Sequence, residues 1–123
     1  MSGDRVFPTG SVRDSRSGKG RFDLIPPEPM FQLARHYEGG CENYGERNWE
    51  MGQPLCASYL DSAERHFYQL KAGMTDENHA IAAVWNLFGF IQTLTWIEDG
   101  VLPQELDDRP KYGKDAMPAV LGR

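Results

Sequence analysis

Cysteine is scarce in this chain, with two residues, Cys41 and Cys56, among 123. Their spacing does not match a zinc-ligand pattern, and one possible disulfide is too few for the framework of a small secreted domain. The N-terminal segment MSGDRVFPTG also lacks the apolar core of a secretory signal peptide. We therefore expect a cytoplasmic protein with two reduced thiols.

Positive charge is also in short supply, because 13 Lys and Arg residues stand against 18 Asp and Glu, a formal net charge of −5. This balance argues against general nucleic-acid binding, so any phosphate site must be local. The best apolar stretch, Ala80 to Leu94, is interrupted by polar residues and is shorter than the ~20 residues that span a bilayer. The sequence therefore predicts no membrane segment.

Three regions divide the chain, which is long enough for one compact domain and a tail. Residues 1–29 hold four glycines and four prolines and predict an extended arm, either a disordered lead-in or an ordered strap over a site. Residues 30–100 predict a helical bundle. Residues 101–123 return to proline, glycine and charge and predict an irregular tail, which we expect to pack partly through Val101 and Leu102.

Apolar periodicity predicts an all-α fold with about three main helices. The first starts near Met30, and Gly39 and Gly40 weaken its centre, so we expect it to end or distort there. The second covers about residues 55–71. The third begins after Thr75 or Asp76, either of which can cap it, and continues to Asp99 as the central, most buried helix. No segment alternates like a strand.

A stripe of polar and small residues follows one face of the third helix: His79, Ala82, Asn86, Gly89 and Thr93. Close packing of a neighbouring backbone explains the small residues. His79 and Asn86 would each cost about 1–3 kcal/mol if buried without partners. The sequence leaves open whether they belong to a satisfied structural network or to a ligand site.

Carboxylates are the main candidates for a metal site. Glu38 and Glu42 lie one helical turn apart and repel each other unless a cation lies between them. In an antiparallel bundle, acidic residues of the neighbouring helices, Asp61 and Glu77, could converge with them on a site for Mg²⁺ or Mn²⁺. An exposed acidic face is the commoner interpretation of such a pattern.

Basic residues of the arm, Lys19 and Arg21 among them, stand beside glycines, which suits the binding of phosphate oxygens. The segment is not a Walker A loop, because Gly20 follows Lys19. A solvated basic tail would look the same. Similarly, Asp61 and Arg65 are spaced for an ordinary exposed ion pair.

Four ordered blocks resemble one known family: GSVRDSRSGKGRFDLIPP, LARHYEGGCENYGERNWEMG, LDSAERHFYQLKAG and DENHAIAAVWNL. They are similar to the phage-associated N-terminal domain of dATP/dGTP diphosphohydrolases of the MazZ type, over about residues 9–108. The resemblance implies a helical relative of MazG-like enzymes, which hydrolyse a nucleoside triphosphate to monophosphate and pyrophosphate with Mg²⁺ or Mn²⁺. The MazG-like signature, EExxE on one helix and ExxD on the next, is absent.

The resemblance also implies roles for individual residues. The expected metal ligands are Glu38, Glu42, Asp61 and Glu77, and the expected catalytic residues are Glu38, Asp61 and His79. The expected substrate-binding residues are Lys19, Arg21 and Arg65 for the phosphates, Asn48 and Trp49 for a purine, and Asn86 as an orienting group.

Two other functions remain open. A non-catalytic phage protein that binds nucleotides or a partner would keep the basic arm and aromatic loop without convergent carboxylates. A structural helical protein could use the polar stripe of its third helix to form a dimer interface. Because the third helix is too apolar for 123 residues to cover alone, we expect a homo-oligomer in every case. A phage-encoded enzyme of this kind would work on purine deoxynucleoside triphosphates in the host cytoplasm.

Overall fold

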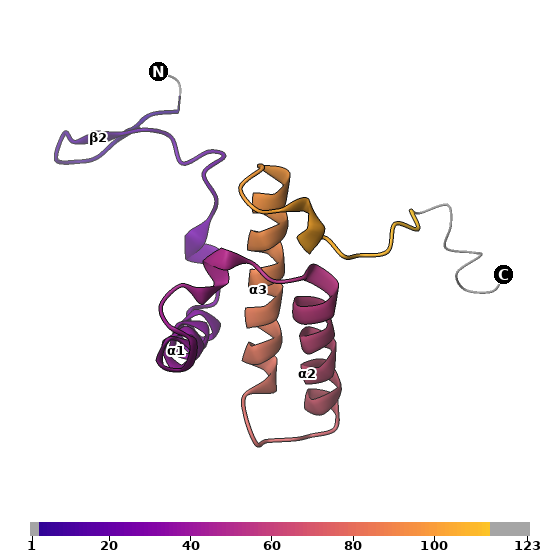
Figure 1. Cartoon of the computed structure of the whole chain (residues 1–123). Helices are drawn as coiled ribbons and strands as arrows, with labels where there is room; N and C mark the ends of the chain where they lie inside the picture. Colours follow the sequence, from indigo (N-terminus) through magenta and orange to yellow (C-terminus); the bar gives the residue numbers. More distant parts are fainter. Residues whose placement is uncertain (1–2, 114–123) are drawn as a thin grey trace.

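The computed structural model describes residues 3–113 and confirms an all-α fold. Its three main helices are α1 (Pro27–Tyr44), α2 (Asp61–Lys71) and α3 (His79–Glu98). Short helical segments lie between and beside them: η1 (Phe22–Leu24), η2 (Asn48–Met51), η3 (Leu55–Leu60) and η4 (Gln104–Leu106). Figure 1 shows α2 and α3 side by side and antiparallel, whereas α1 is seen almost end-on and contacts α3.

The arm contains a small antiparallel hairpin of β1 (Arg5–Val6) and β2 (Val12–Arg13). The expectation that no strand forms is therefore wrong for this segment. Each strand has two residues, too few for an alternating pattern to be visible in the sequence. Gly10, with φ +88°, lets the turn close between them. In Figure 1 the hairpin projects away from the three helices.

Helix α1 begins at Pro27, three residues before the expected start, and runs through Gly39 and Gly40 to Tyr44. Its early start fits the two prolines of its first turn, where the missing N–H groups have no intrahelical partner in any case. The expected break at the glycines is wrong. A loss of ~1 kcal/mol for each glycine does not interrupt a helix that already has a nucleus on each side.

The stretch η3 is a single turn of π-helix that continues directly into α2 and buries Leu55 and Tyr59 completely. After α2, Gly73 adopts φ +75°, the left-handed conformation in which a glycine commonly ends a helix. The cap of α3 is Asn78, whose side chain accepts a hydrogen bond from the Ile81 N–H at 3.1 Å. The expected cap at Thr75 or Asp76 is wrong, because the chain reaches helical geometry only at His79.

Helix α3 is central, as expected. The whole polar and small-residue stripe of α3 is buried: His79, Ala82, Asn86, Gly89 and Thr93. At Gly89 a side chain is excluded, because an added Cβ would lie 2.3 Å from the Tyr59 ring of η3. The side-chain amide nitrogen of Asn86 donates a hydrogen bond to the Ala82 carbonyl oxygen at 2.8 Å, so this buried polar group has a partner. The stripe is therefore in part a packing surface, which permits the close approach of η3 to α3.

The tail returns across the end of the bundle. Leu102 and Leu106 pack against the core formed by Leu55, Tyr59 and Ile97, whereas Val101 is 63% exposed, so the expectation that Val101 packs is wrong. Residues 114–123 of the expected tail lie outside the described residues.

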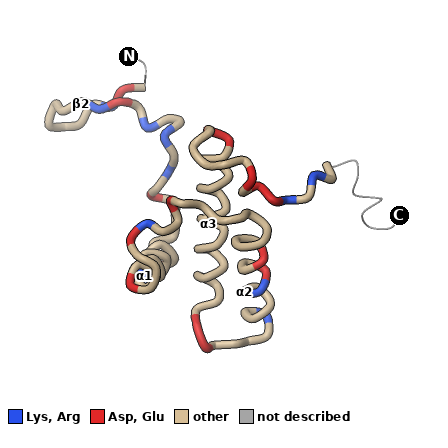
Figure 2. Tube along the Cα trace, viewed as in Figure 1, with Lys and Arg blue, Asp and Glu red and all other residues tan. Residues whose placement is uncertain are grey.

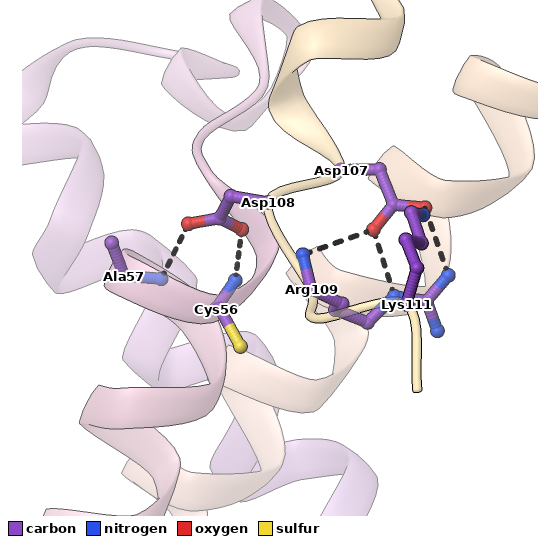
Figure 3. A network of polar contacts seen from close by, with 6 residues as sticks. All are labelled: Cys56, Ala57, Asp107, Asp108, Arg109 and Lys111. Carbon is purple, nitrogen blue, oxygen red and sulfur yellow. Dashed lines mark hydrogen bonds and ion pairs between the residues drawn. The ribbon is translucent and has the colours of Figure 1, made fainter. Parts of the chain in front are cut away.

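A carboxylate anchors the tail to η3. Asp108 accepts hydrogen bonds from the backbone N–H groups of Cys56 (2.6 Å) and Ala57 (3.0 Å), which lowers the pKa of its carboxyl group (Figure 3). The neighbouring Asp107 accepts from Arg109 and Lys111, and these cations hold the pKa of Asp107 well below its usual range. The tail therefore caps the free N–H groups at the start of η3.

Helix α3, with 20 residues, is long and apolar enough to cross a membrane by length and composition alone. The apolar stretch 80–94 is the central part of this longer helix. A core helix passes the same test, and α3 packs against α1, α2 and η3. Of its most apolar 18-residue window, 39% is buried among these elements.

Adding one methyl group at two glycines should have opposite effects. We expect Gly89→Ala to lower the free energy of unfolding by about 1–3 kcal/mol, because the new Cβ displaces Tyr59. Gly39→Ala should raise it by about 0.5–1 kcal/mol, because the Cβ on exposed α1 has open space around it. Urea unfolding of the two variants measures both, and equal effects would contradict the packing described.

Candidate functional site

A cleft of about 990 Å³ opens between α1, the segment after it, the start of α2 and the middle of α3. This volume is at the upper end for small-molecule sites. The aromatic residues in its wall are Tyr37, Tyr44, Trp49, Trp85 and Phe88. Its uncharged polar residues are Asn48, Gln53, Ser58, Ser62, Asn86 and Gln92. Flat apolar surfaces combined with amide and hydroxyl groups suit a ligand with a planar ring and polar edges.

Four of the residues predicted for the site line this cleft: Glu38, Asn48, Trp49 and Asn86. Glu38 is an exposed carboxylate on α1. Trp49 also packs on Trp96 of α3, with 5.8 Å between the ring centroids, so it holds the loop to the bundle as well as forming the wall. Buried Asn86 comes from the stripe of α3. The structure therefore brings residues of three elements, α1, η2 and α3, together.

Arg47 was not among the predicted site residues. It is the sole Lys or Arg among the described residues that line the cleft, and its side chain is 75% exposed beside Glu50, at 3.4 Å. Its backbone is left-handed, with φ +57°, which is uncommon outside glycine. In the sequence, its position next to Asn48 and Trp49 was the feature that could have indicated a place in the site.

Hydroxyl and amide groups of Gln53, of η3 and of the start of α2 were also missed. The Ser58 hydroxyl donates to the side-chain oxygen of Gln53, and both line the cleft. Arg65 donates to the Ser62 hydroxyl at 3.2 Å, which places the predicted phosphate ligand Arg65 beside a lining residue. Small polar residues in helices carry little sequence signal, because their usual location is an ordinary exposed face.

The basic residues of the arm lie outside the cleft lining. Lys19 pairs with Asp14 at 3.8 Å, and Arg21 donates to Asp23 at 2.8 and 2.9 Å. The Arg21 guanidinium lowers the pKa of Asp23, and Asp23 raises the pKa of Arg21. Figure 2 shows these charges along the segment that leaves the helices. In this conformation Lys19 and Arg21 are therefore both paired with acids of the arm itself.

A second polar cluster lies at the turn between α2 and α3. The Nδ1 atoms of His66 and His79 are 3.0 Å apart, and His79 Nε2 is 2.7 Å from an Asp76 carboxylate oxygen. Glu77 contributes an oxygen 3.7 Å from His66 Nδ1. Both histidines are buried, whereas the two acids are exposed. Burial lowers the pKa of His66, and the hydrogen bond with His79 lowers the pKa of Asp76.

Among residues 3–113, this cluster is the one place where three His, Cys, Asp or Glu side chains gather, with ligand atoms of His66, Glu77 and His79 within 4.8 Å of one another. Of the four predicted metal ligands, it includes only Glu77. Glu38 lies in the cleft wall, and Glu42 and Asp61 are exposed on α1 and α2. The four predicted carboxylates are thus not gathered within one chain.

The sequence carried a signal for the histidine pair. His66 and His79 are separated from Gly73 by almost the same number of residues along the sequence. The two helices of an antiparallel hairpin therefore bring their side chains face to face.

Comparison with known proteins gives one match. The model of a family described as dATP/dGTP diphosphohydrolase, N-terminal, matches residues 9–99. No curated protein and no solved structure matches the chain. The matched residues include every residue that lines the cleft and the whole histidine cluster. The match confirms the family predicted from the four sequence blocks, and the chain belongs to the dATP/dGTP diphosphohydrolase N-terminal family.

Proposed function

We propose that this chain hydrolyses a purine deoxynucleoside triphosphate, dATP or dGTP, to the monophosphate and pyrophosphate, and that the substrate lies in the cleft between α1 and α3. The observation that carries the proposal is the composition of the cleft wall, which joins aromatic and amide groups with the guanidinium of Arg47 within the residues that the family model matches.

The base would lie against the aromatic wall. Tyr44 and Trp49 offer flat surfaces for stacking, and the side-chain amides of Asn48 and Asn86 each supply both a donor and an acceptor for purine edges. Pyrimidines present a smaller stacking area. This arrangement therefore supports a purine.

The triphosphate would lie at the open side of the cleft. The exposed guanidinium of Arg47 can exchange Glu50 for phosphate oxygens, and Arg65 stands behind the Ser62 hydroxyl. Lys19 and Arg21 would join them only if the arm leaves its own acidic partners. Arg47 is thus the principal phosphate ligand in this proposal.

The described carboxylates do not fit an Mg²⁺ site within one chain, because Mg²⁺ requires a compact set of oxygen ligands and Glu38, Glu42, Asp61 and Glu77 are not gathered. The proposed reaction is a displacement in which water attacks the α phosphorus. The bond from this phosphorus to the oxygen that bridges the α and β phosphates breaks, and pyrophosphate leaves with that oxygen. Glu38, a carboxylate in the cleft wall, would accept the proton of that water, and Arg47 would neutralise the departing pyrophosphate.

A second candidate is a phage protein that binds the nucleotide without cleaving it. The dispersion of the four predicted carboxylates favours it, since binding needs only the aromatic wall and Arg47. The two candidates share the cleft and differ in whether the nucleotide survives.

Incubation of the purified full chain with each dNTP and with Mg²⁺ or Mn²⁺, followed by ion-exchange chromatography, separates them. We expect monophosphate and pyrophosphate from dATP or dGTP, and a loss of roughly 100-fold or more in rate for Glu38→Gln. Glu28→Gln, an exposed carboxylate of α1 outside the cleft lining, is the matched control and should keep the rate. Intact nucleotides throughout would exclude the enzyme, and retention of dGTP would then support the binding protein.

We also propose that the chain is a homo-oligomer. Outside the cleft lining, the exposed side of α3 carries Val84, Leu87 and Ile91, each 37–60% exposed. A contiguous apolar helix face of this kind is usually covered by another protein surface.

Light scattering coupled to size-exclusion chromatography should give at least twice the 13.9 kDa chain mass. Ile91→Arg, at the most exposed of these positions, should shift the protein to monomer with its helical circular dichroism unchanged. A monomeric wild-type protein at micromolar concentration would contradict the proposal.

A further inference from the structure

Two buried histidines face each other through the same type of ring nitrogen. His66 comes from the last two turns of α2 and His79 from the first residue of α3, and their Nδ1 atoms are 3.0 Å apart. The Asp76 carboxylate contacts His79 Nε2 at 2.7 Å, which favours the tautomer with the proton on Nε2. The Nδ1 lone pair of His79 then points toward His66.

The spacing of these nitrogens matches two ligands of one metal ion. Metal–imidazole bonds of about 2.0–2.1 Å place two adjacent ligand nitrogens about 3.0–3.4 Å apart in octahedral or tetrahedral geometry. The carboxylate of Glu77 supplies a third donor within the 4.8 Å cluster, from an exposed side chain that can rotate. Asp76 occupies the position of the carboxylate that commonly orients a metal-bound histidine.

We propose that His66, His79 and Glu77 form a binding site for one divalent transition-metal ion, with Asp76 as the positioning residue for His79. Two imidazoles and one carboxylate suit Zn²⁺, Co²⁺ or Mn²⁺ and disfavour Mg²⁺, which prefers oxygen ligands. None of these four residues belongs to the cleft lining, so the site is separate from the proposed nucleotide site. The ion would cross-link α2 to α3 at their turn.

A metal-free hydrogen bond between the two imidazoles is the competing explanation of the same geometry. In that state His66 Nδ1–H donates to His79 Nδ1, and the pair joins the two helices without an ion. The hydrogen bond needs neither the Glu77 carboxylate nor added metal. Dependence on Glu77 therefore distinguishes the two explanations.

Isothermal titration of the EDTA-treated full chain, in the absence of nucleotide, tests the proposal with ZnCl₂, MnCl₂ and MgCl₂ separately. We expect one Zn²⁺ per chain, a raised melting temperature with Zn²⁺ and no comparable effect of Mg²⁺. Titration with CoCl₂ should give a visible absorption band typical of nitrogen ligation. Because no nucleotide is present, the result does not depend on the proposed hydrolase activity.

Two of the variants, at Glu77 and Asp76, lie at exposed positions, which keeps the test independent of folding defects at the buried histidines. Glu77→Gln and Asp76→Asn should each weaken Zn²⁺ binding by about 10–100-fold, and His66→Gln should abolish the cobalt band. Glu64→Gln, an exposed carboxylate of α2 outside the cluster, is the matched control and should bind like the wild type. Absence of Zn²⁺ and Co²⁺ binding, or binding unchanged in Glu77→Gln and His66→Gln, would overturn the metal site and leave the hydrogen-bonded pair.

Discussion

The close approach of η3 to α3 at Gly89 is the constraint on which the rest of the structure depends. The Tyr59 ring occupies the space that a side chain at position 89 would fill, and Tyr59 is completely buried there. Because η3 continues into α2, this contact sets where α2 runs along α3. The same stripe of α3 supplies Asn86 to the cleft and His79 to the histidine cluster, so both candidate sites depend on one packing surface.

Helical periodicity alone predicted the central elements. The stripe from His79 to Thr93 was recognised because its residues repeat every three or four positions, and all of them are buried. Local signals were less decisive: the α1 helix passes through Gly39 and Gly40, and Asn78 rather than Asp76 caps α3. In these places cooperative helix formation and side-chain partners outweighed the preference of a single residue.

The sites were harder to predict, because they depend on which helix faces meet. Glu38, Asn48 and Asn86 were identified by residue type and do line one cleft, but Arg47 became visible only once the loop was placed beside α1 and α3. The expected carboxylate site required Glu38 and Glu77 to converge, whereas the helical hairpin brings Glu77 to two histidines. The periodicity of a sequence predicts which face of a helix is buried, but it does not predict which other helix packs against that face.

Photochemical cross-linking tests the central claim, that the nucleotide lies between α1 and α3, most directly. The full chain would be irradiated with 8-azido-dATP, digested and analysed by mass spectrometry, with excess dGTP and excess dTTP as separate competitors. The account predicts labelling within residues 44–53, at Tyr44 or Trp49, and protection by dGTP but not by dTTP. Labelling confined to the arm or to the α2–α3 turn, or equal protection by both competitors, would contradict it.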